Sequence, residues 1–246
     1  MQDYLDTGVL EAHHGFVFVE RQIGDKTQSG LVVALDLDQY DYNKGSQTLI
    51  RATEGTILDR IPPRMDVRRD ALLETPHILV LYDDPEGVVL SEILAHKEVL
   101  PLAYDFELMA GSGHLEGRLV EHAGLIDSVI NGLASLIEPA AYMQKYDLPN
   151  ADSPLLFAMG DGNHSLATAK AIWEELKPHV GSDHPSRYAL VELVNLHDPS
   201  LCFEPIHRVL FDPGEDFLTA MEVYFAEKVS FHPAADMPTL VAEVVK

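Results

Sequence analysis

Residues 155–165 most constrain what this chain can fold into. They read Leu155-Leu-Phe-Ala-Met-Gly-Asp-Gly-Asn-His-Ser165. The apolar run is typical of a buried strand, and the two glycines after it are typical of a tight turn. From there to Leu176 the apolar residues recur at helical spacing, and they include Leu166, Ala169 and Trp173. This stretch therefore predicts a strand, a turn and an amphipathic helix.

The turn between this strand and helix has the features of a phosphate site. Gly160 and Gly162 permit positive φ and close approach by a ligand. The amides of Asn163–Ser165 would point free donors at an anion, which gains roughly 0.3–1 kcal/mol from the helix dipole. Strand–glycine–helix junctions are also common in α/β proteins, where Asp161 or Asn163 could simply cap the helix. Both interpretations stay open at this point.

Composition indicates a globular protein with a substantial core. The chain has 246 residues, of which 46% are hydrophobic, and this length allows one large domain or two small ones. No apolar run is long enough to span a bilayer, and the N-terminus lacks the pattern of a signal peptide. A single cysteine, Cys202, excludes an internal disulfide framework and a cysteine-rich metal site. We expect a cytoplasmic location and no membrane partner.

The charge balance argues against a nucleic-acid partner. Forty acidic residues against 17 basic ones give a net charge of −23. Non-specific nucleic-acid binding depends on basic patches that release counterions from the polyanion. A small phosphorylated ligand needs only a local cluster, so a small-molecule substrate and a nucleotide are the expected partners.

Along the chain, hairpin patterns alternate with strand–helix patterns, which predicts an α+β or mixed α/β fold. Residues 15–21 and 30–36 predict a hairpin, and residues 77–84 and 187–195 predict central strands. Residues 66–73 and 124–136 predict helices, while Pro62 and Pro63 argue against a continuous helix across residues 61–64. We expect one unit over residues 1–246, with a possible sub-boundary near 110–150. The amphipathic pattern at 239–246 stops abruptly, so we expect a fragment of a longer chain.

Three further clusters could carry chemistry. Arginines gather at positions 60, 64, 68 and 69, and Arg51 begins the charged segment 51–56. Their planar forks suit either phosphate or surface carboxylates. Surface pairing is the simpler interpretation for Arg68 and Arg69. His207-Arg208 could contact a ligand, or His207 could be a hydrogen-bonded core histidine. Asp83-Asp84 at the end of a strand could lie near a magnesium ion, or in a solvated loop.

Three segments in order, residues 49–56, 161–165 and 203–208, resemble an uncharacterised bacterial and archaeal family, DUF1015. They read Leu-Ile-Arg-Ala-Thr-Glu-Gly-Thr, Asp-Gly-Asn-His-Ser and Phe-Glu-Pro-Ile-His-Arg. Most members of that family have Arg-His-Glu-x-Thr, Asp-Gly-His-His-Arg and Pro-Thr-His-Arg there. The family is similar to the ParB/sulfiredoxin superfamily, which includes free-serine kinases. The resemblance therefore implies a ParB/sulfiredoxin-like core with additional hairpins and helices.

The resemblance also implies a nucleotide site, because superfamily members hold nucleotide phosphates at a glycine turn before a helix. Residues of this chain that match the motifs are Arg51, Glu54, Thr56, Gly162 and His164. Asn163 stands where sulfiredoxins have their catalytic cysteine, which excludes sulfinic-acid repair. Ser165 replaces the usual arginine, so a compensating arginine, Arg51 or Arg208, would have to reach the site.

We therefore expect a nucleotide-dependent phosphotransferase that acts on a small hydroxyl-bearing metabolite such as a free amino acid, with ATP or ADP and Mg²⁺. The expected catalytic residues are Glu54, Asp161 and His164, with Asp161 also the candidate Mg²⁺ ligand. The expected cofactor-binding residues are Gly160, Gly162, Asn163, His164, Ser165, Arg51, Thr56, His207 and Arg208. One alternative is a non-catalytic nucleotide-binding switch or interaction module, and another is a metal-dependent hydrolase.

Overall fold

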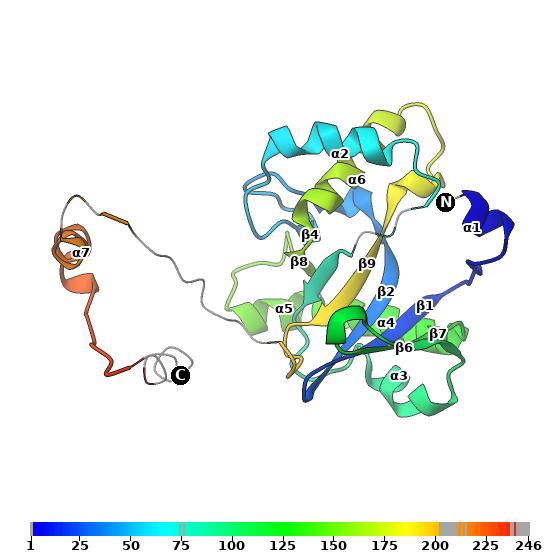
Figure 1. The fold of residues 1–246 in the computed structure, drawn as a ribbon, viewed down its shortest axis with the longest axis horizontal. Coiled ribbons are helices and arrows are strands. Elements are labelled where there is room, and N and C mark those ends of the chain that lie inside the picture. The colour runs from blue at the N-terminus through cyan, green and yellow to red at the C-terminus, as the bar shows by residue number, and fades with distance from the viewer. Residues whose placement is uncertain are drawn as a thin grey trace. The chain divides into compact units, whose positions relative to one another are not determined.

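The computed structural model describes residues 2–73, 75, 77–201, 211–212, 214, 216–236 and 239. The chain divides into two compact units, residues 1–201 and 202–246. All described strands belong to the first unit, as does the range 110–150 (Figure 1). In the second unit the described helix is α7 (Phe217–Phe225), whose N-cap Asp216 accepts hydrogen bonds from the amides of Leu218 and Thr219.

One mixed sheet organises the first unit, and it confirms the α+β class expected from the sequence. Within the described residues it has nine strands in the order β3-β4-β8-β5-β9-β2-β1-β7-β6. Only the β3–β4, β4–β8 and β5–β9 pairs of that sheet are parallel. The strands are β1 (Phe16–Ile23), β2 (Lys26–Asp36), β3 (Tyr40–Asp41), β4 (Ile50–Arg51), β5 (Leu79–Tyr82), β6 (Leu102–Glu107), β7 (His114–Val120), β8 (Phe157–Asp161) and β9 (Tyr188–Asn195).

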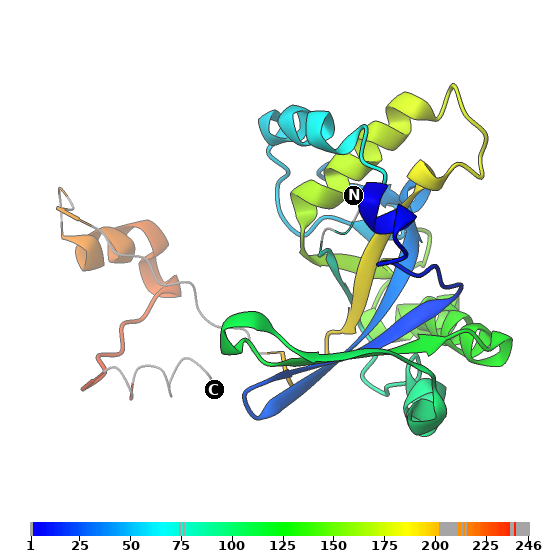
Figure 2. The same cartoon turned by 45° about the vertical axis from the view of Figure 1, so that its right-hand side comes forward.

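Helices flank this sheet, and α2 lies alongside α6 in both views (Figures 1 and 2). The helices of the first unit are α1 (Gln2–Asp6), α2 (Ile61–Arg68), α3 (Ser91–His96), α4 (Ala123–Leu136), α5 (Pro139–Tyr146) and α6 (Asn163–Leu176). Among the described residues, no helix has the length and apolar character that crossing a bilayer requires.

The core covers one face of the sheet. On β2 and β9, alternate residues such as Leu31, Val33 and Leu193 are buried against side chains of α3, α4 and α6. The other face carries Ala34 and Leu190, which are exposed. The side chains alternate between the two faces with a period of two, and Val19, Glu192 and Val194 on this second face are also buried.

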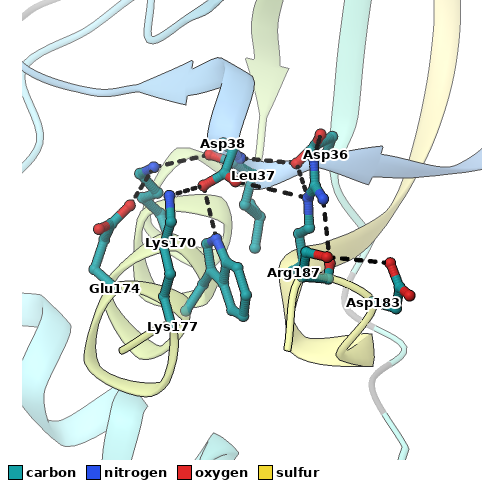
Figure 3. A network of polar contacts seen from close by, with 10 residues as sticks. Asp36, Leu37, Asp38, Lys170, Glu174, Lys177, Asp183 and Arg187 are labelled. Carbon is teal, nitrogen blue, oxygen red and sulfur yellow. Dashed lines mark hydrogen bonds and ion pairs between the residues drawn. The ribbon is translucent and has the colours of Figure 1, made fainter. Parts of the chain in front are cut away.

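A polar network at the end of β2 fastens α6 to the sheet (Figure 3). Trp173 Nε1 donates to Asp38 Oδ1 over 2.9 Å, and Lys177 Nζ donates to the same oxygen over 2.6 Å. These two hydrogen bonds lower the pKa of the Asp38 carboxyl. The guanidinium of Arg187 donates to both carboxylate oxygens of the neighbouring Asp36, from Nε over 3.0 Å and from Nη2 over 2.6 Å. These contacts anchor the C-terminal part of α6 to the end of β2. Because the helix is rigid, they also help to fix the position of its first turn.

The predicted hairpin, the central strands, the 124–136 helix and the strand–turn–helix of residues 155–176 are confirmed. The prediction of a short helix over 66–73, with no helix across the prolines, is wrong, because α2 spans Ile61–Arg68. Pro62 and Pro63 occupy the first helical turn, where a backbone N–H has no intrahelical acceptor to lose. The helix therefore begins at the prolines.

Candidate functional site

The turn between β8 and α6 is built around Gly162. This residue is the N-cap of α6 and has a φ of +80°, in the left-handed region that favours glycine. A Cβ on it would also lie only 3.1 Å from the carbonyl oxygen of His77 and from the Cα of Ile78. The backbone at this turn therefore both needs a glycine and packs closely against the start of β5.

The first turn of α6 leaves its backbone donors available. The first helical hydrogen bond runs from the amide of Leu166 to the carbonyl of Gly162, and Gly162 has no side chain to cap the helix. Within the described part of the chain, the amides of Asn163, His164 and Ser165 have no acceptor. Free amides at a helix start are the geometry that binds anions such as phosphate.

Residues 51–57, which contain most of the predicted 49–56 motif and the residue after it, lie against this turn. Since β4 pairs in parallel with β8, the chain leaving β4 runs past the start of α6. Asn163 Nδ2 donates to Thr56 Oγ1 over 3.1 Å, and the hydroxyl of Tyr40 donates to Asn163 Oδ1 over 3.3 Å. Asn163 is buried, and its side-chain amide links β3 and the 51–57 segment to the start of α6. Two motifs that are about a hundred residues apart in the sequence thus form one structure.

His164 is held by the same segment. Its Nε2 accepts a hydrogen bond from the amide of Ile57 over 3.2 Å, which puts the proton of the neutral ring on Nδ1. The imidazole is half-buried. His164 is therefore a fixed donor through Nδ1, as contact with a phosphate oxygen requires.

Arg51 is directed at the protein's own backbone. Its Nε donates to the carbonyl of Thr48 over 2.7 Å, and its Nη2 donates to the carbonyls of Ser153 and Pro154 over 2.7 and 3.3 Å. The guanidinium thus ties β4 to the loop before β8. Its contact with a nucleotide phosphate stays a prediction.

A different arginine lies beside the helix start. Arg68, at the end of α2, donates from Nη1 to the carbonyl of Ser165 over 3.0 Å, and burial lowers the pKa of its guanidinium to about 10. Arg69, for which surface pairing was also expected, meets the Glu175 carboxylate at 2.6 Å. The packing of α2 on α6 brings Arg68 here, and no sequence spacing signals that approach.

Glu54 borders a cavity of about 360 Å³. The cavity is lined by residues 42–46 and 51–55, and the Glu54 side chain is exposed. Asp161, at the end of β8, is also exposed, and its Oδ1 accepts a hydrogen bond from the amide of Gly162 over 2.7 Å. Both carboxylates are thus accessible: Asp161 belongs to the turn, and Glu54 belongs to the segment whose Thr56 contacts Asn163. His207 and Arg208 lie outside the described residues.

Asp161 is the candidate Mg²⁺ ligand, and its surroundings fit an ion that is bound jointly by the protein and by the phosphates of a ligand. Among the described residues, no three His, Cys, Asp or Glu side chains gather as a metal site. Mg²⁺ commonly binds through one or two carboxylates together with substrate phosphates and water. A single accessible carboxylate beside a phosphate-binding turn suits that arrangement.

Asp83 and Asp84 do not lie in a solvated loop: their side chains contact neighbouring elements, and Asp84 Oδ1 is buried without a hydrogen-bond partner among the described residues. Asp83 meets His197 Nε2 at 2.7 Å, Lys145 Nζ at 2.9 Å and the hydroxyl of Tyr146. Burial raises the pKa of the Asp83 carboxyl, but these hydrogen bonds outweigh it and bring the pKa down to about 2. Asp84 is buried and accepts from the amide of Val89. The pair therefore holds α5 and the end of β9 to β5.

This lowered pKa predicts an acid-sensitive contact. Because the carboxyl of Asp83 has a lower pKa in the folded state, its contribution is complete above pH 4 and is lost as the pH falls from about 4 to 2. We expect Asp83→Asn to cost about 1–2 kcal/mol at pH 7 and almost nothing at pH 2. Urea unfolding of both proteins across this range measures the effect. A constant difference at all pH values would contradict it.

Comparison with known proteins places the chain in a family. No curated protein and no solved structure gives a significant match. A family model described as protein of unknown function (DUF1015) matches residues 1–243. That match spans the sheet, the β8–α6 turn and the 51–57 segment. The chain therefore belongs to the DUF1015 family.

Proposed function

We propose that this protein is a nucleotide-dependent phosphotransferase that acts on a small hydroxyl-bearing metabolite. The observation that carries the proposal is the turn at Gly160–Ser165, where uncapped helix amides meet the 51–57 segment. Phosphoryl transfer needs mainly positioning and charge neutralisation, which fixed amides and a few charged groups supply. The resemblance to the ParB/sulfiredoxin superfamily and its free-serine kinases supports the same function.

In this proposal the nucleotide phosphates bind the amides of the first turn of α6, and His164 donates to them through Nδ1. Asp161 holds Mg²⁺ together with the phosphates, and Glu54 is a second carboxylate within the site. Arg68, and by resemblance Arg51 and Arg208, would offset the charge that develops on the transferred group. ATP or ADP is the expected nucleotide, because the related serine kinases use them.

Titration calorimetry with ATP, ADP, CTP and GTP, each with Mg²⁺, tests the nucleotide site. We expect selective binding by the wild-type protein and a loss of roughly tenfold or more in His164→Ala, since a charge-assisted hydrogen bond contributes about 1.5–3 kcal/mol. Because His164 also accepts from Ile57, thermal unfolding of the variant must accompany the titration. The absence of binding by folded wild-type protein would end the proposal.

The alternative is a nucleotide-binding switch without catalysis, which the resemblance to ParB proteins supports. Both functions require binding, so loss of affinity in His164→Ala does not separate them. Glu54→Ala does, because Glu54 is exposed and makes no hydrogen bond among the described residues. An enzyme should keep its affinity for nucleotide and lose rate in this variant, whereas binding with no turnover in the wild type would favour the switch.

A further inference from the structure

Another cavity lies at the other end of β5 from the β8–α6 turn. The strands β5 and β9 are parallel, and both end beside this cavity, where Tyr82 pairs with Asn195. In open α/β sheets, ligands commonly bind at the carboxyl ends of the strands. The cavity has a volume of about 320 Å³, which suits a small molecule. Its walls come from the two strand ends, from residues 85–87 and 197–199, and from Leu90 and Leu94 at α3.

Tyr82 contributes a hydroxyl without a protein partner to this cavity. The residue is 2% exposed, and it is one of those that line the cavity. Its hydroxyl makes no hydrogen bond with any described residue. A polar group that is withdrawn from water without a partner costs folding free energy, and a bound molecule can supply that partner. The hydroxyl is therefore placed to contact a ligand in the cavity.

The carboxylate of Asp84 lies close to the Tyr82 hydroxyl. Asp84 is 1% exposed, and its Oδ2 accepts a hydrogen bond from the amide of Val89 over 2.9 Å, whereas Oδ1 has no partner among the described residues. The side chain of Asn195 fixes the Asp84 backbone, since it bonds both the amide and the carbonyl, at 3.2 and 2.7 Å. Burial raises the pKa of the Tyr82 hydroxyl, and the nearby charges of Asp84 and Asp198 raise it further. The phenol therefore stays protonated between two carboxylates.

The charged groups around this cavity are mostly acidic. Glu86 is exposed and forms no ion pair with a described residue. Asp198 accepts hydrogen bonds from two backbone amides, over 3.0 and 2.8 Å, but no described cation pairs with it. His197 is paired with Asp83 at 2.7 Å. Within the described part of the chain, no lysine or arginine lines the cavity. The negative charges of Asp84, Glu86 and Asp198 thus lack a cationic partner there.

The spacing of these carboxylates suits an organic cation better than a metal ion. Ca²⁺ and Mg²⁺ need about six or more oxygen ligands at roughly 2.0–2.6 Å. Among the described residues, no three His, Cys, Asp or Glu side chains come close enough to form such a site. A primary ammonium group is larger, and its three N–H donors can reach acceptors that lie apart. Leu90 and Leu94 offer apolar surface to an alkyl chain beside these charges.

We propose that this cavity binds a small primary alkylammonium ion, at a site separate from the phosphate turn and independent of the proposed phosphotransferase function. The ammonium group donates to the hydroxyl oxygen of Tyr82, and the carboxylates of Asp84 and Asp198 offset its charge. The alkyl chain packs against Leu90 and Leu94. The ligand class is therefore a short aliphatic amine that is protonated at neutral pH.

Titration of the ¹⁵N-labelled full chain with n-butylammonium chloride tests the site, with ionic strength held constant by NaCl. We expect saturable shifts of the amide resonances of residues 84–90 and 195–198. The neutral probe n-butanol has nearly the same shape and lacks the charge, so we expect it to bind at least tenfold more weakly. Calorimetry with the same two probes gives the affinities.

Two variants remove the groups that carry the proposal. Tyr82→Phe should weaken butylammonium binding roughly three- to tenfold and leave the melting temperature unchanged, because no described residue loses a hydrogen bond. Asp84→Asn keeps the shape of the side chain and should weaken binding tenfold or more. Tyr142→Phe is the matched control for the hydroxyl, since that hydroxyl accepts from the amide of Leu155 over 2.8 Å. It should lower the melting temperature and keep full affinity.

Asp127→Asn is the matched control for charge, because Asp127 is exposed on α4 and does not line the cavity. It should bind butylammonium as the wild type does. Unchanged affinity in both Tyr82→Phe and Asp84→Asn would overturn the proposal. Amide shifts spread over the whole acidic surface, equal binding of n-butanol, or displacement of butylammonium by stoichiometric CaCl₂ would overturn it as well.

Discussion

Truncating Trp173 to alanine should destabilise the protein by about 3–5 kcal/mol, which corresponds to a fall in melting temperature of roughly 10 °C. The indole is 1% exposed, and it packs between α6 and the sheet. The substitution leaves a cavity of indole size and also removes the hydrogen bond from Nε1 to Asp38. Urea or thermal unfolding followed by circular dichroism measures the loss.

Trp173→Phe separates packing from the hydrogen bond. It keeps an aromatic ring in the core and removes only the N–H donor and part of the volume. We expect about a third of the loss seen with alanine, because a single hydrogen bond contributes about 1 kcal/mol. Equal losses in the two variants would mean that the Asp38 contact dominates. A loss below about 1 kcal/mol in Trp173→Ala would contradict the burial of the side chain.

Replacing Arg21 with methionine should cost about 3–5 kcal/mol, because it leaves the Glu192 carboxylate buried without its bidentate partner. The side chains of Arg21 and Glu192 are 18% and 5% exposed. His77 is the remaining partner of Glu192 among the described residues, through a single nitrogen. The free energy of unfolding from urea titration is the measurement.

Two controls make this prediction specific. The double variant Arg21→Met with Glu192→Leu should recover most of the loss, because a buried ion pair contributes little over a packed apolar pair. Arg69→Met removes half of an exposed pair with Glu175 and should leave the melting temperature almost unchanged. If the double variant were as unstable as Arg21→Met, the loss would come from packing of the arginine stem rather than from the uncompensated charge.

Local patterns predicted the elements that surround the site. The apolar run before Gly160 and the helical spacing of Leu166, Ala169 and Trp173 indicated β8 and α6, and both form where expected. The prediction from the prolines was wrong. Pro62 and Pro63 were expected to prevent a helix, but they lie in the first turn of α2. A proline disrupts a helix only where its N–H would have had an acceptor. The outcome depended on where the helix began, which local sequence specifies weakly.

Which charged residues reach the turn depends on tertiary structure. Sequence motifs correctly linked residues 51–56 with 161–165, and the structure joins them through Thr56 and Asn163. The same motifs singled out Arg51, which binds backbone carbonyls, and passed over Arg68, which the packing of α2 on α6 brings to Ser165. No period or motif marks a residue whose role comes from a helix–helix contact.

The contacts of Glu192 with His77 and Arg21 also depend on tertiary structure. These three residues lie on different strands or beside them, up to 171 positions apart. No local sequence pattern distinguishes any of them. By itself the sequence determined the fold class, the strand–turn–helix and the family, because these depend on short-range periodicity and contiguous motifs. Tertiary structure alone decided which side chains face one another, because strand order and register are set by packing across the whole sheet.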